Sequence, residues 1–137
     1  MTFVVGGIDH LVLTVVDIER TVAFYRDVLG CVPIAFGEGR RALAFGDQKI
    51  NLHTAGREFE PKATRPTPGS GDLCFVTVSP IADVLATLEL RGVPIEEGPV
   101  PRAGAQGPMT SVYVRDPDGN LLEVASYADA PGGAAGG

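Results

Sequence analysis

Four side chains in this sequence are candidates to hold a divalent metal ion together. They are the two histidines of the chain, His10 and His53, and the carboxylates Asp72 and Glu123. Imidazole and carboxylate together are what a borderline ion such as Zn²⁺, Ni²⁺, Co²⁺, Mn²⁺ or Fe²⁺ accepts. Each lies in or beside a short apolar stretch, so the pattern predicts a metal site. A polar, solvated sheet face without any ligand is the competing interpretation.

Glu123 is the most informative of these residues because it interrupts the apolar run from Leu121 to Ala125, directly after the turn sequence "RDPDGN". An ionised carboxylate in a buried strand is unfavourable unless it has a positive partner. We therefore expect Glu123 to bind a cation or to move a proton beside one, as a catalytic base.

An internal repeat indicates which elements position these residues. Residues 9–34 align with residues 71–95: each copy has a run of β-formers, a turn, a helical stretch, a glycine and then "VPI". Asp17 is expected to cap the first helix and Gly30 to end it. Ser79 is expected to cap the second helix, with Pro80 at its first position.

Further strands are expected after each helix, so that each half forms a βαβββ module. They are predicted at about 32–38, 40–46 and 49–55 in the first half, and at about 95–100, 110–116 and 120–126 in the second. The sequence thus predicts an α+β fold in which one domain, residues 1–127, contains two modules, at about 7–56 and 71–127. Residues 57–70 are expected to form a linker and residues 128–137 a disordered tail.

Side chains alternate along a strand, so the apolar residues decide which face meets the helix. In the first half Leu11, Leu13, Val15, Ile50 and Leu52 are assigned to the helix side. His10, Asn51 and His53 then face the other way, and in the second half so do Asp72 and Glu123. The predicted metal site therefore lies on the sheet faces opposite the helices.

The bulk properties exclude several classes of partner. With a net charge of −6 and a pI of about 4.8, the chain lacks the basic footprint that nucleic acids or anionic membranes require. No apolar stretch approaches the roughly 18 residues of a membrane helix, and no signal peptide is recognisable at the N-terminus. Two cysteines do not make a disulfide framework, so a cytoplasmic location is expected.

Guanidinium and amide groups suggest how a small substrate is held. Arg102 lies in the Gly/Pro-rich segment "GPVPRAGAQGP", which is expected to be a loop able to close over a substrate. Arg41 and Asn51 are the other candidate substrate contacts, since guanidinium groups suit carboxylates and phosphates. For each arginine, a solvated surface charge is the competing interpretation.

The segments "IDHLVLTVVDIERTVAFYRDVLG" and "RDPDGNLLEV" resemble the two signatures of the vicinal oxygen chelate superfamily, which includes glyoxalases, bleomycin-resistance proteins and dioxygenases. The likeness covers residues 8–127 and is greatest to a subgroup of glyoxalase domain-containing and lactoylglutathione-lyase-like virulence proteins. The resemblance implies mixed sheets that form a cup around a metal, with His10 and Glu123 as ligands. Asn51 and Asp72 stand where glyoxalase I has Glu and His, and His53 is a possible replacement ligand.

The resemblance leaves three functions open. The first is a metal-dependent lyase or isomerase that acts on a small substrate through two neighbouring oxygens. The second is a binding protein without chemistry, of the antibiotic-binding type. The third is an Fe²⁺ extradiol dioxygenase using His10, His53 and Glu123. Chains of this length in the superfamily commonly form homodimers, which we expect here.

Overall fold

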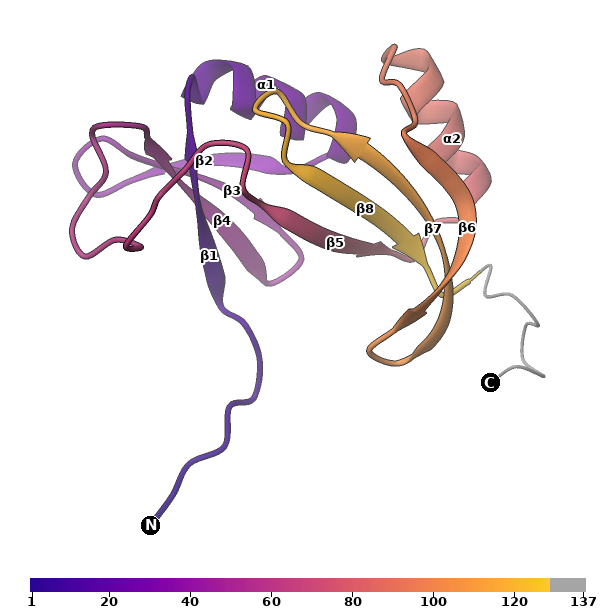
Figure 1. Ribbon diagram of the computed structural model, residues 1–137, viewed down its shortest axis with the longest axis horizontal. Coiled ribbons are helices and arrows are strands. Elements are labelled where there is room, and N and C mark those ends of the chain that lie inside the picture. Colours follow the sequence, from indigo (N-terminus) through magenta and orange to yellow (C-terminus); the bar gives the residue numbers. More distant parts are fainter. Residues whose placement is uncertain (129–137) are drawn as a thin grey trace. The chain divides into compact units, whose positions relative to one another are not determined.

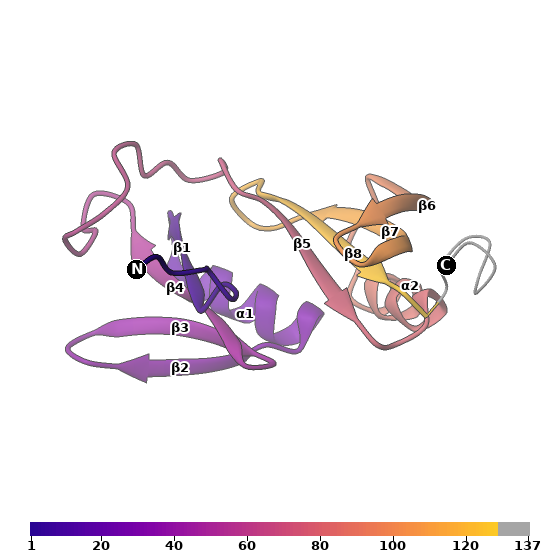
Figure 2. The same cartoon turned by 90° about the horizontal axis from the view of Figure 1, so that it is seen from below.

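Two compact units make up the chain in this computed structural model, which describes residues 1–128. The first unit comprises residues 1–68 and the second begins at Gly69. Each contains one helix and one four-stranded mixed sheet in the order βαβββ (Figures 1 and 2). The predicted α+β class and its two modules are thereby confirmed. A disordered tail is predicted at residues 128–137, and the part beyond Ala128 lies outside the described residues.

The first unit runs through five elements. These are β1 (His10–Val15), α1 (Ile18–Leu29), β2 (Val32–Phe36), β3 (Arg40–Phe45) and β4 (Gln48–Thr54). The sheet order is β1-β4-β3-β2, with β1 parallel to β4 and the other pairs antiparallel. The second unit repeats this plan with β5 (Asp72–Thr77), α2 (Ile81–Leu90), β6 (Glu97–Gly104), β7 (Gly107–Arg115) and β8 (Leu121–Ser126), in the order β5-β8-β7-β6.

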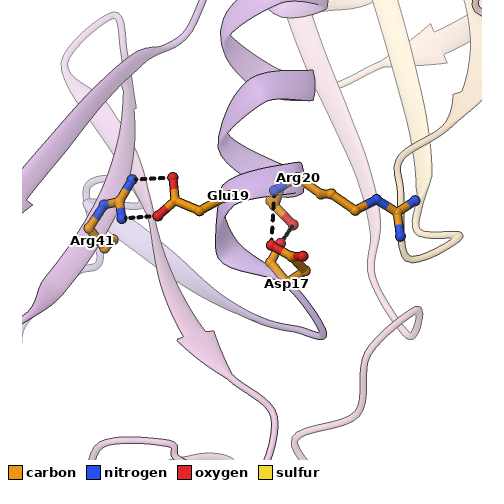
Figure 3. A network of polar contacts seen from close by, with 5 residues as sticks. Asp17, Glu19, Arg20 and Arg41 are labelled. Atoms are coloured by element: carbon orange, nitrogen blue, oxygen red, sulfur yellow. Dashed lines mark hydrogen bonds and ion pairs between the residues drawn. The ribbon is translucent and has the colours of Figure 1, made fainter.

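The ends of α1 are those that the sequence predicts. The Asp17 carboxylate accepts a hydrogen bond from the backbone N–H of Arg20 at 3.1 Å (Figure 3), and Gly30 takes the left-handed conformation with φ 72°. The start of α2 differs from the prediction. Pro80, not Ser79, is the N-cap residue, and no side chain caps this helix. Gly92, with φ 67°, follows its last turn.

The core of the first unit lies between α1 and one face of its sheet. Val15, Ile50 and Leu43 are completely buried, and Tyr25 meets them from the helix. In the second unit Leu122 and Val112 are equally buried. Burial of such apolar faces is the main contribution that fixes each sheet against its helix.

The segment around Arg102 is a strand rather than a loop. β6 continues to Gly104, and a two-residue turn at Ala105 and Gln106 connects it to β7. The Gly/Pro content suggested a loop, but β6 is an edge strand, where proline removes no hydrogen bond that the sheet needs. Among residues 1–128, no helix is long and apolar enough to cross a membrane.

Candidate functional site

The face of the first sheet opposite α1 is organised in three rows of aligned residues. The middle row contains Val12, Asn51, Ala42 and Ile34, which are successive partners across β1, β4, β3 and β2. His10, Lys49, Ala44 and Val32 form the row on one side. The row on the other side includes the pairs Thr14–His53 and Arg40–Phe36. The alternation predicted from the sequence therefore brings His10, Asn51 and His53 to one face.

His10 is oriented by its neighbour in the chain. Its Nδ1 lies 2.7 Å from Oδ1 of Asp9, and 43% of the His10 side chain is exposed. A carboxylate at that distance favours the proton on Nδ1, which leaves the lone pair on Nε2. A carboxylate that fixes the tautomer in this way is the usual support of a metal-binding imidazole. The donor chemistry of His10 thus fits a metal ligand.

Asn51 is nearly inaccessible, and its side-chain oxygen is unsatisfied. The residue is 5% exposed, and Oδ1 has no hydrogen-bond donor within reach. Its partners across the sheet are Val12 and Ala42, whose side chains have no polar atoms. A buried acceptor without a donor is unfavourable by about 1–3 kcal/mol, so a group outside the protein chain is the natural donor.

Two cations lie on this face against aromatic rings. The Arg40 guanidinium carbon is 5.2 Å from the ring centre of Phe36 and 4.5 Å from that of Phe59. The Lys49 ammonium is 4.0 Å from the ring centre of Phe36. Such contacts hold a cation over the negative face of a ring without neutralising its charge.

His53 is covered from the loop that follows β4. The Phe59 ring stands edge-on to the imidazole, with 5.5 Å between ring centres, and His53 is 4% exposed. Loss of solvent and the nearby charge of Arg40 lower the pKa of His53, so the ring is neutral at pH 7. A neutral imidazole is the form that binds a metal, but the adjacent guanidinium opposes a second cation. His53 is thus a weaker candidate ligand than His10.

The loop that carries Phe59 is held by Glu58. One Glu58 oxygen accepts the backbone N–H of Gly56 at 2.7 Å, and the other lies 3.4 Å from the Lys62 ammonium. These contacts lower the pKa of Glu58, chiefly through the Gly56 bond. Residues 57–62, expected to belong to a linker, therefore form an anchored loop over the sheet of the first unit.

In the second unit Glu123 also lies on the face opposite the helix. It pairs with Cys74 on β5 and with Tyr113 on β7. The Ser111 hydroxyl donates a 2.7 Å hydrogen bond to its Oε2, and the Cys74 thiol is also within hydrogen-bonding range of this carboxylate. Asp72 is two residues before Cys74 on β5, so it shares this face and is exposed. The two predicted carboxylate ligands thus lie on adjacent strands of one sheet.

The thiol of Cys74 is a poor nucleophile in this setting. Loss of solvent, together with the adjacent Glu123 carboxylate, raises the pKa of Cys74 to about 11. Only a small fraction is thiolate at pH 7, and the thiolate is the form that reacts and binds metals.

Arg102 belongs to a polar network on the same sheet. Its Nε donates a 2.8 Å hydrogen bond to the Tyr113 hydroxyl, and its Nη2 lies 3.1 Å from Glu97. Tyr113 is the cross-strand partner of Glu123, so the network lies beside the predicted base. Arg102 remains a candidate substrate contact, although Glu97 already compensates its charge.

Arg41 lies on the other side of the first sheet. Its guanidinium forms an ion pair of 2.6 Å with Glu19 on α1 (Figure 3). Its neighbour Arg40 is the residue that shares a face with Asn51. This placement does not support a substrate contact from Arg41. The antiparallel register of β3 with β4 decides which of the two arginines faces α1, and two consecutive arginines in the sequence do not reveal that register.

The turn before β8 fixes the start of two strands in the second unit. Asn120 Oδ1 accepts the backbone N–H of Gly71 at 2.7 Å, while its Nδ2 donates to Asp116 Oδ2 at 2.8 Å. Gly71 precedes Asp72, and Asn120 stands three residues before Glu123. The "DPDGN" sequence thus positions both carboxylates. The supporting residues Asp9 and Ser111 carried no sequence signal, because an aspartate beside a histidine and a serine in a strand are common.

Within residues 1–128, no three His, Cys, Asp or Glu side chains approach one another closely enough to hold a metal ion. His10 belongs to the first unit, whereas Asp72 and Glu123 belong to the second. Each unit by itself therefore presents an incomplete set of metal donors.

Comparison with known proteins finds a family model and two relatives that each match most of this chain. The family model described as Glyoxalase/Bleomycin resistance protein/Dioxygenase superfamily matches residues 7–124. The virulence protein STM3117 of Salmonella typhimurium is 56% identical over 90% of this chain and 86% of its own length. The glyoxalase domain-containing protein RDO1 of Mycosarcoma maydis is 56% identical over 92% of this chain and 71% of its own length.

Solved structures extend the comparison. An integron cassette protein from Vibrio cholerae has a TM-score of 0.91 at 55% identity, with 93% of this chain and 99% of that chain covered. A lactoylglutathione lyase from Agrobacterium tumefaciens has a TM-score of 0.68 at 26% identity over 88% of this chain and 93% of its own. TnmS3, an antibiotic binding protein from Streptomyces, shares the fold with a TM-score of 0.71 at 22% identity, covering 91% of this chain and 98% of its own.

Proposed function

Since the chain belongs to the Glyoxalase/Bleomycin resistance protein/Dioxygenase superfamily, we propose that it is a metal-dependent lyase or isomerase of the glyoxalase type. Its substrate is a small molecule that presents two neighbouring oxygen atoms to the ion. The subgroup resemblance noted in the sequence is confirmed by relatives that include a virulence protein and a glyoxalase domain-containing protein.

One observation carries the proposal. His10 and Glu123 both lie opposite the helix of their unit, and each contacts a neighbouring side chain. The contact of His10 Nδ1 with Asp9 leaves Nε2 for a metal ion, and the Ser111 hydroxyl holds Glu123 Oε2. Support of this kind is typical of metal ligands and seldom needed by solvated surface groups.

His10, Glu123 and Asp72 are the residues proposed to hold the ion, with His53 as the weaker candidate. Zn²⁺, Ni²⁺, Co²⁺, Mn²⁺ and Fe²⁺ all suit this donor set. A divalent ion supplies Lewis-acid polarisation of the substrate oxygens, which contributes several kcal/mol to catalysis.

The chain itself supplies positioning and proton transfer. Asp9 keeps the imidazole in one tautomer and one orientation. Ser111 holds one oxygen of Glu123, and the carboxylate would bind the ion or accept a proton from the substrate. General-base catalysis of this kind typically contributes about 10²- to 10⁴-fold.

The proposal requires one copy of each unit to meet at the ion, within one chain or between two. A homodimer is part of the proposal. Light scattering behind a sizing column should give twice the chain mass of 14.3 kDa. If the measured mass equals that of a monomer at all protein concentrations, the homodimer is no longer part of the proposal.

Metal analysis of protein purified without an affinity tag tests the central claim. Wild type should carry about one ion per site, and His10→Ala/Glu123→Ala should carry almost none. The control Arg20→Ala/Glu89→Ala changes exposed residues on the two helices, away from the sheet faces of the site, and should match wild type. Equal, substoichiometric metal in wild type and in the His10/Glu123 variant would refute the proposal.

The identity of the ion separates two chemistries. Nickel, zinc, cobalt or manganese favours the lyase, whereas iron favours an extradiol-type dioxygenase. The hemithioacetal of methylglyoxal and glutathione then tests the narrowest activity. We expect weak turnover at most, because Asn51 and Asp72 replace the Glu and His of glyoxalase I.

A small-molecule binding protein without catalysis is the second candidate. The observation that favours it is the apolar surface around Asn51, where Val12 is 44% and Ile34 37% exposed beside Phe36. Apolar surface with a few polar groups is typical of ligand sites. Ligand affinity that is unchanged by metal removal, together with no turnover of any substrate, would favour this function.

A further inference from the structure

We infer that the helix-free face of the first unit holds a subsite for a small hydroxycarboxylate. Its carboxylate lies between Arg40 and Lys49, and its hydroxyl donates a hydrogen bond to Asn51. The subsite deepens the proposed function by naming a substrate class. It rests on the proposed function in one respect, namely that both are assigned to the same site. The contacts that support it all lie within residues 1–68.

The first argument is charge that no acid compensates. The other arginines on sheet strands have carboxylate partners: Arg41 pairs with Glu19, Arg102 with Glu97 and Arg115 with Glu96. Within the described residues, Arg40 and Lys49 form no such pair.

Aromatic rings hold Arg40 and Lys49 instead, and both cations contact the same ring, that of Phe36. Two like charges gathered at one ring repel each other unless an anion or solvent compensates them. A negatively charged ligand fits this position.

The second argument is where the charges meet. Lys49 and Phe36 belong to the two outer rows of the face, which are separated by roughly 13 Å along the strands. The ammonium nevertheless lies 4.0 Å from the ring centre, so the two side chains converge over the middle row. The small side chain of Ala42 lies in that row beside Asn51, and both residues are buried.

The third argument is the unsatisfied oxygen of Asn51. It is buried, it needs a donor, and neither neighbour in its row offers one. A carboxylate has no proton to donate, so an anion alone would satisfy the cations but not the amide. A hydroxyl on the carbon next to a carboxylate satisfies both with one small molecule.

The loop residue Phe59 completes the subsite. Its ring covers Arg40 and His53, and Glu58 fixes the loop through Gly56 and Lys62. The acid of this loop is therefore already engaged. Glu58 keeps Phe59 over the guanidinium without supplying a carboxylate to it.

The test is an NMR titration of ¹⁵N-labelled protein from which metal has been removed with a chelator. Three matched probes are used: glycolate, acetate, which lacks the hydroxyl, and ethylene glycol, which lacks the charge. Glycolate should shift the resonances of Ala42 and Asn51 and bind about tenfold more tightly than acetate, the effect expected of one hydrogen bond to an unsatisfied group. Ethylene glycol should not shift these resonances.

Matched variants locate the effect. Arg40→Gln and Lys49→Gln should each weaken glycolate about tenfold, whereas the adjacent Arg41→Gln, on the opposite face, should bind as wild type does. Asn51→Ala should bind glycolate and acetate equally. Retention of the remaining cross-peaks confirms that each variant is folded.

Three results would overturn the inference: no glycolate-dependent shift on this face, equal affinity of wild type for glycolate and acetate, or equal weakening by Arg40→Gln and Arg41→Gln. The titration uses metal-free protein, so it is independent of the metal analysis. Failure of the metal site would leave a positive titration intact, and a negative titration would leave the metal site standing.

Discussion

The same substitution at the two asparagines of the chain should change stability by very different amounts. Asn51 and Asn120 are both buried, at 5% and 1% exposure. The Asn120 amide forms hydrogen bonds with Gly71 and Asp116, whereas the oxygen of Asn51 has no donor. Burial is therefore matched, and hydrogen bonding is what differs.

The magnitudes follow from the partners left behind. Asn120→Ala leaves the Gly71 N–H without its acceptor, at about 1–3 kcal/mol, and removes a hydrogen bond to the Asp116 carboxylate, at about 1.5–3 kcal/mol, so a loss near 4 kcal/mol is expected. Asn51→Ala removes a desolvated acceptor that already lacks a partner. The relief offsets the small cavity, and we expect the free energy of unfolding to change by less than about 1 kcal/mol.

Urea unfolding followed by far-ultraviolet circular dichroism measures the difference. With a denaturant slope of about 2 kcal/mol per molar, the midpoint should fall by about 2 M for Asn120→Ala and by less than about 0.5 M for Asn51→Ala. Equal losses in the two variants would refute the reasoning, because they would mean that Asn51 is as well satisfied as Asn120. A protein that retains an unfavourable polar group at no gain in stability has another use for it.

Two further predictions concern titratable groups. Burial and Arg40 lower the pKa of His53, so the unfolded state binds the proton more readily than the folded state does. Wild type should therefore lose stability as the pH falls below about 6.5. The His53→Gln variant should lose less, as measured by the difference between its urea midpoints at pH 7.5 and 5.5. An undiminished loss in the variant would contradict this assignment. The pKa of Cys74 is raised to about 11 from its ordinary value of 9.0. Iodoacetamide should therefore modify this thiol about 100-fold more slowly than an ordinary thiol, and the Glu123→Gln variant should recover part of the modification rate. Mass spectrometry against glutathione as reference gives both rates, and a rate equal to that of glutathione would be the contrary result.

The parts of the fold that follow from local chemistry could be predicted from the sequence. Asp17 caps α1 because a short carboxylate reaches the free N–H groups of the first turn, and Gly30 ends it because glycine accepts a positive φ. The alternation of apolar residues likewise placed Asn51 and His53 on the face away from α1, as the strand register confirms. These signals need only the residue and its near neighbours.

The features that depend on pairing could not be predicted in this way. Whether Arg40 or Arg41 faces α1 is decided by the register of β3 against β4, and the letters "RR" are the same in either register. Arg102 lies in a strand because β6 pairs with β7 at a sheet edge, where its prolines are tolerated. The covering of His53 by Phe59 depends on a loop fixed by Glu58, which no periodic pattern reveals.

The repeat itself explains why the two units carry different charges on equivalent faces. By the internal alignment Asn51 corresponds to Glu123, and a carboxylate at position 51 would lie on the same face as the cations Arg40 and Lys49. Such a carboxylate would attract both cations and neutralise them. An amide cannot do so, and the two positive charges remain available to an external anion. In the second unit Glu123 contacts the neutral Ser111 hydroxyl and Cys74 thiol, and it forms no ion pair within the described residues, so its charge is left for a cation or a proton. One exchange of amide for carboxylate between the repeats thus divides the proposed work of this strand position, with anion recognition around Asn51 and metal or proton chemistry at Glu123.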